Sequence, residues 1–150
     1  MNKSRLVRFV IRDMMIKDYP AVVALWKRAK LVYKPKGRDT KNRIARELKL
    51  STSIFLVAVV KRKIIGVIFG THDGRKGWIN RLAVDPGFQR QGIARVLVNE
   101  VEKRFLMIGL EIFACLIESY NKQSMIVFNK MGYKLHKDIF YFTKRLNPDI

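Results

Sequence analysis

Short stretches dense in hydrophobic residues recur along the chain, and each predicts a β-strand. Residues 54–60 and 64–71 are rich in β-branched and aromatic side chains and are separated by Lys61-Arg62-Lys63, which predicts a hairpin of two buried strands. The turn at 72–76 contains Asp-Gly, a strong hairpin signal, and leads into a strand over 78–84. Further strands are expected at 6–12, at 111–118, and in a final hairpin of 133–135 and 139–145.

Helical periodicity predicts four helices around these strands. The first runs from an Asp18 cap to Arg28, and the third covers residues 91–108 before Gly109. Shorter helices are expected over 39–48 and 122–131. The expected core-facing positions are Val22, Leu25, Trp26 and Ala29 in the first helix and Ile93, Leu97, Val101 and Phe105 in the third. A helical connection makes strands 78–84 and 111–118 parallel neighbours, so the expected fold class is α/β (α+β).

The segment from Trp78 to Leu106 reads as a strand, a small-residue loop and the start of a long helix. Backbone N–H groups at a helix start lack intrahelical partners, and the helix dipole adds partial positive charge there. Gly92 and Ala94 allow close approach of an anion, and Arg90 and Arg95 add charge. The segment matches neither a P-loop nor a dinucleotide fingerprint. It therefore predicts a site for a pyrophosphate.

Two motifs resemble those of the GNAT (GCN-related N-acetyltransferase) superfamily. Residues 82–94, reading LAVDPGFQRQGIA, resemble its motif Arg/Gln-x-x-Gly-x-Gly/Ala after a strand. Residues 121–133, reading NKQSMIVFNKMGY, resemble its second motif, Asn-x-x-Ala-x-x-Leu-Tyr-x-x-x-Gly-Phe. The resemblance covers nearly the whole chain in the right order and is nearest to the RimI-like and YpeA-like acetyltransferases.

The resemblance implies a GNAT fold with a mixed, mostly antiparallel sheet of about seven strands and about four helices, with acetyl-CoA between splayed fourth and fifth strands. The implied reaction is acetyl transfer to a primary amine, a protein N-terminus or lysine, by direct attack on the thioester, with no metal. Tyr33, in the loop between the first two helices, is the implied acceptor contact. The implied acetyl-CoA contacts are the backbone of Leu82, Ala83 and Val84, the phosphate-binding residues Gln89, Arg90, Gln91, Gly92, Ile93, Ala94 and Arg95, and the pantetheine neighbours Asn121, Ser124 and Phe128.

The chain departs from the family pattern at both usual catalytic positions. Phe128 stands where a tyrosine acid is common, and Leu116 stands where RimI-like enzymes carry a glutamate. Strand alternation puts Glu118 on the same face as Leu116, which makes Glu118 a candidate base. Tyr120 and Tyr133 are candidate acids. The alternatives are a solvated carboxylate, tyrosines that serve packing, and proton transfer through solvent.

Charge and composition widen the set of partners. Thirty-one Lys and Arg residues against 12 Asp and Glu give a net charge of +19, which favours acidic proteins or peptides, nucleic acid or the ribosome. Two rival hypotheses therefore remain: a non-catalytic acyl-CoA-binding module and a basic nucleic-acid- or ribosome-binding protein. A lone Cys115 excludes an intramolecular disulfide. Without a signal peptide or apolar span, a cytoplasmic protein of one domain over residues 1–150, monomeric or homodimeric and away from membranes, is expected.

Overall fold

A computed structural model describes residues 6–150. Its strands form one sheet in the order β1-β2-β3-β4-β5. The first four strands pair antiparallel, and β4 and β5 pair parallel, as expected from the helical connection between them. The strands are β1 (Val10–Asp13), β2 (Ser53–Val60), β3 (Lys63–His72), β4 (Gly77–Val84) and β5 (Phe113–Cys115).

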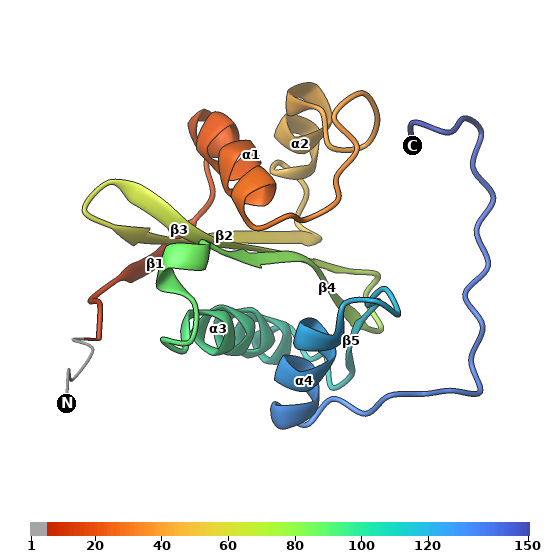
Figure 1. Cartoon of the computed structure of the whole chain (residues 1–150). Coiled ribbons are helices and arrows are strands. Elements are labelled where there is room, and N and C mark those ends of the chain that lie inside the picture. Colours follow the sequence, from red (N-terminus) through yellow and green to blue (C-terminus); the bar gives the residue numbers. More distant parts are fainter. Residues whose placement is uncertain (1–5) are drawn as a thin grey trace.

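Helices cover both faces of the sheet, with α1 and α2 on one face and α3 and α4 on the other (Figure 1). Two short 3-10 turns, η1 and η2, precede α1 and follow β4. The bounds are η1 (Ile16–Asp18), α1 (Tyr19–Arg28), α2 (Lys41–Glu47), η2 (Pro86–Phe88), α3 (Ile93–Met107) and α4 (Lys122–Lys130). The α/β class expected from the sequence is confirmed.

Strand alternation divides the interior into two cores. In β2, Leu56 and Ala58 face α3, whereas Phe55 and Val57 face α1. The helix faces expected from periodicity are confirmed: Val22, Leu25 and Trp26 of α1 and Ile93, Leu97, Val101 and Phe105 of α3 are all buried, and Ala29 packs beside them. Because both faces are covered, the central strands are buried on both sides, which explains their nearly continuous hydrophobic sequence.

Some expected elements are shorter than predicted or absent. The first strand spans Val10–Asp13 rather than 6–12, and the strand expected over 111–118 forms only as Phe113–Cys115. Asp18 occupies the position before α1 without capping it, because its carboxylate accepts hydrogen bonds from Arg12 and the Met15 N–H.

The final hairpin is also absent, so the described chain has five strands rather than about seven. Residues 133–150 form no strand and run as an extended segment whose end lies beside the loop after α1 (Figure 1), where Lys34 Nζ donates to the Pro148 carbonyl. Their apolar residues have strand propensity, but a strand forms only where a neighbouring strand edge is free to pair with it. The short β5 ladder of three residues provides little such edge.

Candidate active site

The sheet opens between β4 and β5. These strands pair only from Gly77–Ile79 to Phe113–Cys115, whereas β4 continues to pair with β3 as far as Val84. In the described chain, the outer edge of Asn80–Val84 therefore has no strand beside it. The Val84 carbonyl accepts a hydrogen bond from Gln89 Nε2 at 3.3 Å. The other backbone groups on this edge are available to an extended ligand, as an unpaired sheet edge is to a peptide.

A bulge in β4 lies just beyond the point where β4 and β5 separate. Val67 pairs with Ala83 and Phe69 pairs with Asn80, so Ile68 alone faces both Arg81 and Leu82. Arg81 has a φ of 52°, in the left-handed region that a non-glycine residue rarely adopts. Such bulges bend a strand and redirect its groups, and strained residues of this kind concentrate at functional sites.

Asp85 anchors the loop that follows β4. Its side chain is buried and binds Arg28 at 3.0 Å, Lys63 at 3.3 Å and the Gly87 N–H at 3.0 Å. Burial by itself would raise the pKa of Asp85, but these hydrogen bonds and charges lower it overall. The loop is therefore held at its start by an ionised carboxylate, which leaves its later residues open to the cleft.

The start of α3 provides an anion-binding backbone. Gly92 precedes the helix with a φ of 79° and open space around a virtual Cβ, and no side chain caps the helix. Arg90 is also left-handed, with a φ of 59°. Alternation of such residues points successive N–H groups into one concavity, which binds anions. The predicted phosphate site thus has a suitable backbone, with the exposed Arg90 and Arg95 side chains beside it.

One cleft of about 1170 Å³ connects these features with the helices on either side. Leu116, Glu118 and Tyr120 form part of the wall that follows β5. Most of the residues that the sequence assigned to acetyl-CoA line this cleft, namely Leu82, Ala83, Val84, Gln89, Arg90, Gly92, Ile93, Ala94, Arg95, Asn121, Ser124 and Phe128. The Asn121 side chain accepts a hydrogen bond from the Ser124 N–H and so caps α4 at the cleft.

Three sequence-assigned residues do not line the cleft. Tyr33 packs its ring on Trp26 with centroids 5.5 Å apart. The Gln91 side chain accepts a hydrogen bond from the Val7 N–H. The Tyr133 hydroxyl donates to Glu102 at 2.6 Å. Burial, and to a lesser extent the Glu102 carboxylate, raises the pKa of Tyr133 far above its ordinary value. Of the candidate proton-transfer groups, the structure thus brings Glu118 and Tyr120 to the cleft.

The wall formed by β5 and α4 is mostly apolar. Phe128 is buried and meets Tyr133 edge-on, while Leu116 is more than half exposed to the cleft. Cys115 also lines the cleft, and burial raises the pKa of its thiol to about 11. The thiol is therefore protonated near neutral pH and has little nucleophilic character.

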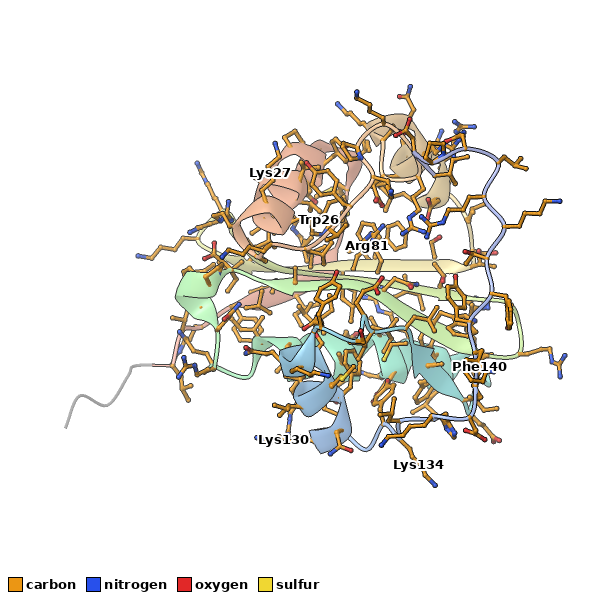
Figure 2. All side chains as sticks on the ribbon, turned by 45° about the vertical axis from the view of Figure 1, so that its right-hand side comes forward. Trp26, Lys27, Arg81, Lys130, Lys134 and Phe140 are labelled. Atoms are coloured by element: carbon orange, nitrogen blue, oxygen red, sulfur yellow. The ribbon has the colours of Figure 1, made fainter. Side chains whose placement is uncertain are left out.

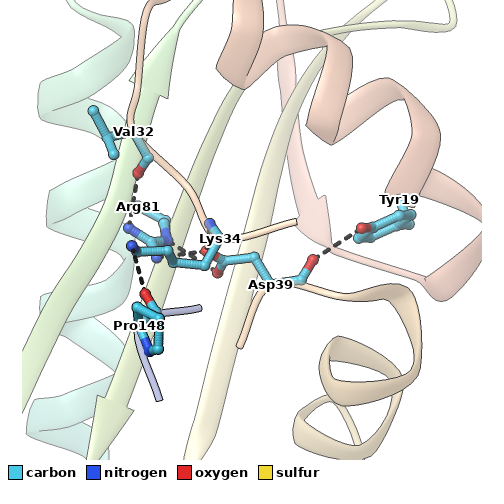
Figure 3. A network of polar contacts seen from close by, with 6 residues as sticks. All are labelled: Tyr19, Val32, Lys34, Asp39, Arg81 and Pro148. Carbon is cyan, nitrogen blue, oxygen red and sulfur yellow. Dashed lines mark hydrogen bonds and ion pairs between the residues drawn. The ribbon is translucent and has the colours of Figure 1, made fainter. Parts of the chain in front are cut away.

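The opposite end of the cleft contains an ion pair that sequence reasoning missed. Arg81 donates from Nε at 3.2 Å and Nη2 at 2.7 Å to the buried carboxylate of Asp39, and also contacts the Val32 carbonyl (Figure 3). Asp39 further accepts the Lys34 N–H at 2.6 Å. Arg81 lies between the sheet and the loop after α1 (Figure 2). This fork-shaped pairing fixes the α1–α2 loop on the bulge of β4.

Glu47 is another cleft residue that sequence reasoning missed. It lies in the last turn of α2, half-buried, and lines the same cleft as Asp39 and Arg81. A compositional signal was present: Asp39 and Glu47 are the only acidic residues between positions 30 and 49. Exposed cations surround them in this segment, namely Lys30, Lys36, Arg38, Lys41, Arg43, Arg46 and Lys49.

The geometry can accommodate acetyl-CoA as an acyl donor. The pantetheine arm needs a free strand edge, which Asn80–Val84 provides, and the pyrophosphate needs unpartnered N–H groups, which the start of α3 provides. Within residues 6–150, no group of three His, Cys, Asp or Glu side chains is placed to bind a metal ion. Across the same residues, no helix combines the length and apolarity needed to cross a membrane.

Comparison with solved structures identifies the fold. A PaiA N-acetyltransferase from Thermoplasma acidophilum in complex with coenzyme A is 18% identical, with a TM-score of 0.79 over 87% of this chain and 92% of that one. An aminoglycoside acetyltransferase bound to a bisubstrate analogue is also 18% identical, with a TM-score of 0.76 over 92% and 99%. The ribosomal-protein-S18-alanine N-acetyltransferase from Escherichia coli is 17% identical, with a TM-score of 0.71 over 83% and 77%.

The family is established by sequence. The model of the acetyltransferase (GNAT) family matches residues 16–133, which include both motifs, the bulged strand and all four helices. The chain therefore belongs to the acetyltransferase (GNAT) family, and it is an acetyl-CoA-dependent acetyltransferase.

Proposed function

We propose that this enzyme acetylates a primary amine at the N-terminus or a lysine of an acidic protein or peptide. The observation that carries the proposal is one cleft, which joins the β4 edge and the α3 N-terminus to the α1–α2 loop and α2, where the exposed Lys30 and Arg38 line it. A donor at one end and an acceptor at the other would meet beside Arg81 and Leu82, where β4 and β5 separate.

Residues of the chain have distinct roles in this proposal. The backbone of Leu82–Val84 orients the donor, and the N–H groups of Ile93–Arg95 hold its pyrophosphate. The thioester, when bound, supplies an activated acyl group. Glu118 and Tyr120 line the cleft and are the proposed groups that exchange protons with the amine and the departing sulfur.

The apolar wall favours an α-amine over a lysine as acceptor. A lysine amine has a reference pKa of about 10.4, whereas an α-amine has a reference pKa of about 7.7–8.0, so much more α-amine is neutral near pH 7. Phe128 and Leu116 have no proton to exchange, and Glu118 and Tyr120 are exposed. A site with few proton-exchanging groups can still accelerate the reaction by positioning an amine that is already neutral.

The charged rim favours an acidic acceptor chain. Exposed cations along residues 30–49 would attract carboxylates that follow the acetylated amine and would repel a polycation. Most of this interaction is solvent-screened, so it acts mainly on association and weakens with salt.

A matched pair of peptides tests the proposal. We expect Ala-Asp-Glu-Asp-Gly to be acetylated with a kcat/KM at least tenfold above that of Ala-Lys-Arg-Lys-Gly, with the ratio falling as salt is added. Fragmentation of the intact peptides by tandem mass spectrometry locates the acetyl group. Preference for the basic peptide contradicts the acidic acceptor, and acetylation of neither peptide nor of any amine in a broad panel contradicts the activity on peptides.

The apolar catalytic positions support a second candidate, a non-catalytic acyl-CoA-binding module. It predicts coenzyme A binding without acyl transfer to any amine. It also predicts that Glu118→Gln behaves like the parent in every assay, whereas the proposed enzyme loses activity in this variant while retaining its affinity for coenzyme A.

A further inference from the structure

Glu47 is a half-buried carboxylate without a partner. Among the described residues, no cation lies within ion-pair distance of its side chain and no hydrogen bond to its carboxylate is formed. This is unexpected in a chain with 31 Lys and Arg residues. Burial of an unpaired carboxylate costs free energy, so a partner from outside the chain would relieve that cost.

The neighbouring charges do not satisfy this carboxylate. Arg81 lines the same cleft, but its guanidinium is committed to Asp39 and the Val32 carbonyl. Arg43 lies one turn earlier on α2 and is exposed. Burial raises the pKa of Glu47, the Asp39 carboxylate raises it further, and Arg81 and Arg43 oppose that rise.

The other carboxylates at the cleft are less suited to hold a ligand cation. Asp39 is buried, and both of its oxygens accept hydrogen bonds from Arg81 or from Lys34. Glu118 is exposed and belongs to the opposite wall, where water screens its charge. Glu47 alone combines partial burial, a free carboxylate and a place on the α2 side of the cleft.

We propose that Glu47 is the residue that binds the ammonium group of the acceptor and so selects amines over their acetylated products. This assignment rests on the proposed function and adds its recognition group. The exposed cations of residues 30–49 would attract the acidic chain of the acceptor, and Glu47 would receive its positively charged end. The bound ammonium then gives its proton to Glu118 or to water, and the neutral amine attacks the thioester. After transfer, the amide carries no charge, so the product loses this ion pair and dissociates more readily.

Direct binding tests the assignment without turnover. The enzyme saturated with coenzyme A is titrated by calorimetry with Ala-Asp-Glu-Asp-Gly and with its N-acetylated form. A charge-assisted hydrogen bond is worth about tenfold or more in affinity, so we expect the free amine to bind the parent at least tenfold more tightly than the acetylated peptide. In Glu47→Gln the two peptides should bind with nearly equal affinity, and Glu47→Asp should restore part of the difference.

Glu111→Gln is the matched control, because Glu111 is exposed and lies outside the cleft. It should retain the full preference for the free amine. In steady-state assays, Glu47→Gln should raise the KM for the peptide at least tenfold, with a smaller effect on kcat and an unchanged affinity for coenzyme A. An undiminished preference in Glu47→Gln overturns the assignment, and so does equal binding of both peptides by the parent. Either result leaves the proposed function standing if the parent still acetylates peptides.

Discussion

The two ends of the cleft bind in different ways. The donor end relies on backbone: the edge of Asn80–Val84 and the uncapped start of α3 after Gly92. The acceptor end relies on charged side chains, with Asp39 and Arg81 joined in a buried pair and Glu47 left free. A backbone site tolerates side-chain changes, whereas a side-chain site can change its ligand by single substitutions. The same fold is found in an aminoglycoside acetyltransferase and in a ribosomal-protein-S18-alanine N-acetyltransferase, whose names give different acceptors.

The largest expected effect belongs to the acceptor end. Arg81→Met should leave the Asp39 carboxylate buried without its cation and lower the free energy of unfolding by about 3 kcal/mol, or roughly 6–12 °C in Tm. Arg104→Met removes solvent-accessible pairs with Asp13 and Glu100 and should cost about 1 kcal/mol or less. Chemical denaturation measures both. If Arg81→Met/Asp39→Asn is no more stable than Arg81→Met, the loss does not come from the unpaired charge.

Reaction of Cys115 with a thiol reagent tests whether burial keeps this cleft-lining thiol unreactive. Its pKa of about 11, against the ordinary 9.0, leaves about a hundredfold less thiolate at pH 8. Modification should therefore be about a hundredfold slower in the native enzyme than in denaturant, and the native rate should keep rising up to about pH 11. A native rate that levels off near pH 9 would mean that burial does not control this thiol.

A pair of glycine substitutions isolates the backbone contribution at the donor end. Gly92 and Gly74 have φ values of 79° and 81° and open space around a virtual Cβ, so valine strains both similarly. Gly92→Val should weaken coenzyme A binding roughly tenfold, because the strain displaces the N–H groups that start α3. Gly74→Val, in the turn between β3 and β4, should leave that affinity unchanged. Equal losses in the two variants would indicate a general effect on stability.

Sequence patterns offered more candidate residues for the donor end than for the acceptor end. Local rules identify a small-residue loop at a helix start, so Gly92 and Ala94 could be found without knowing what surrounds them. Arg81 and Asp39 are 42 positions apart, and only the bulge in β4 and the path of the α1–α2 loop bring them together. Tyr33 was assigned from its loop alone, and a loop residue gives no sign that it packs on Trp26, so its contact with the acceptor stays a prediction.

Strands at the edge of the sheet are also harder to predict from local sequence than strands in its centre. The strands paired on both sides were predicted closely, since hydrophobic runs and the Asp73-Gly74 turn define them. The final hairpin was predicted from strand propensity alone and is not formed by residues 133–150. Pairing at an edge depends on a tertiary partner that no local pattern contains.

Hydrogen exchange with and without coenzyme A tests the central claim that β4 and the start of α3 form the donor site. The account predicts that coenzyme A slows amide exchange in residues 80–84 and 93–95 and leaves residues 30–49 unchanged. Protection confined to residues 30–49, or no protection in residues 80–84 and 93–95 when the enzyme is saturated, would contradict it.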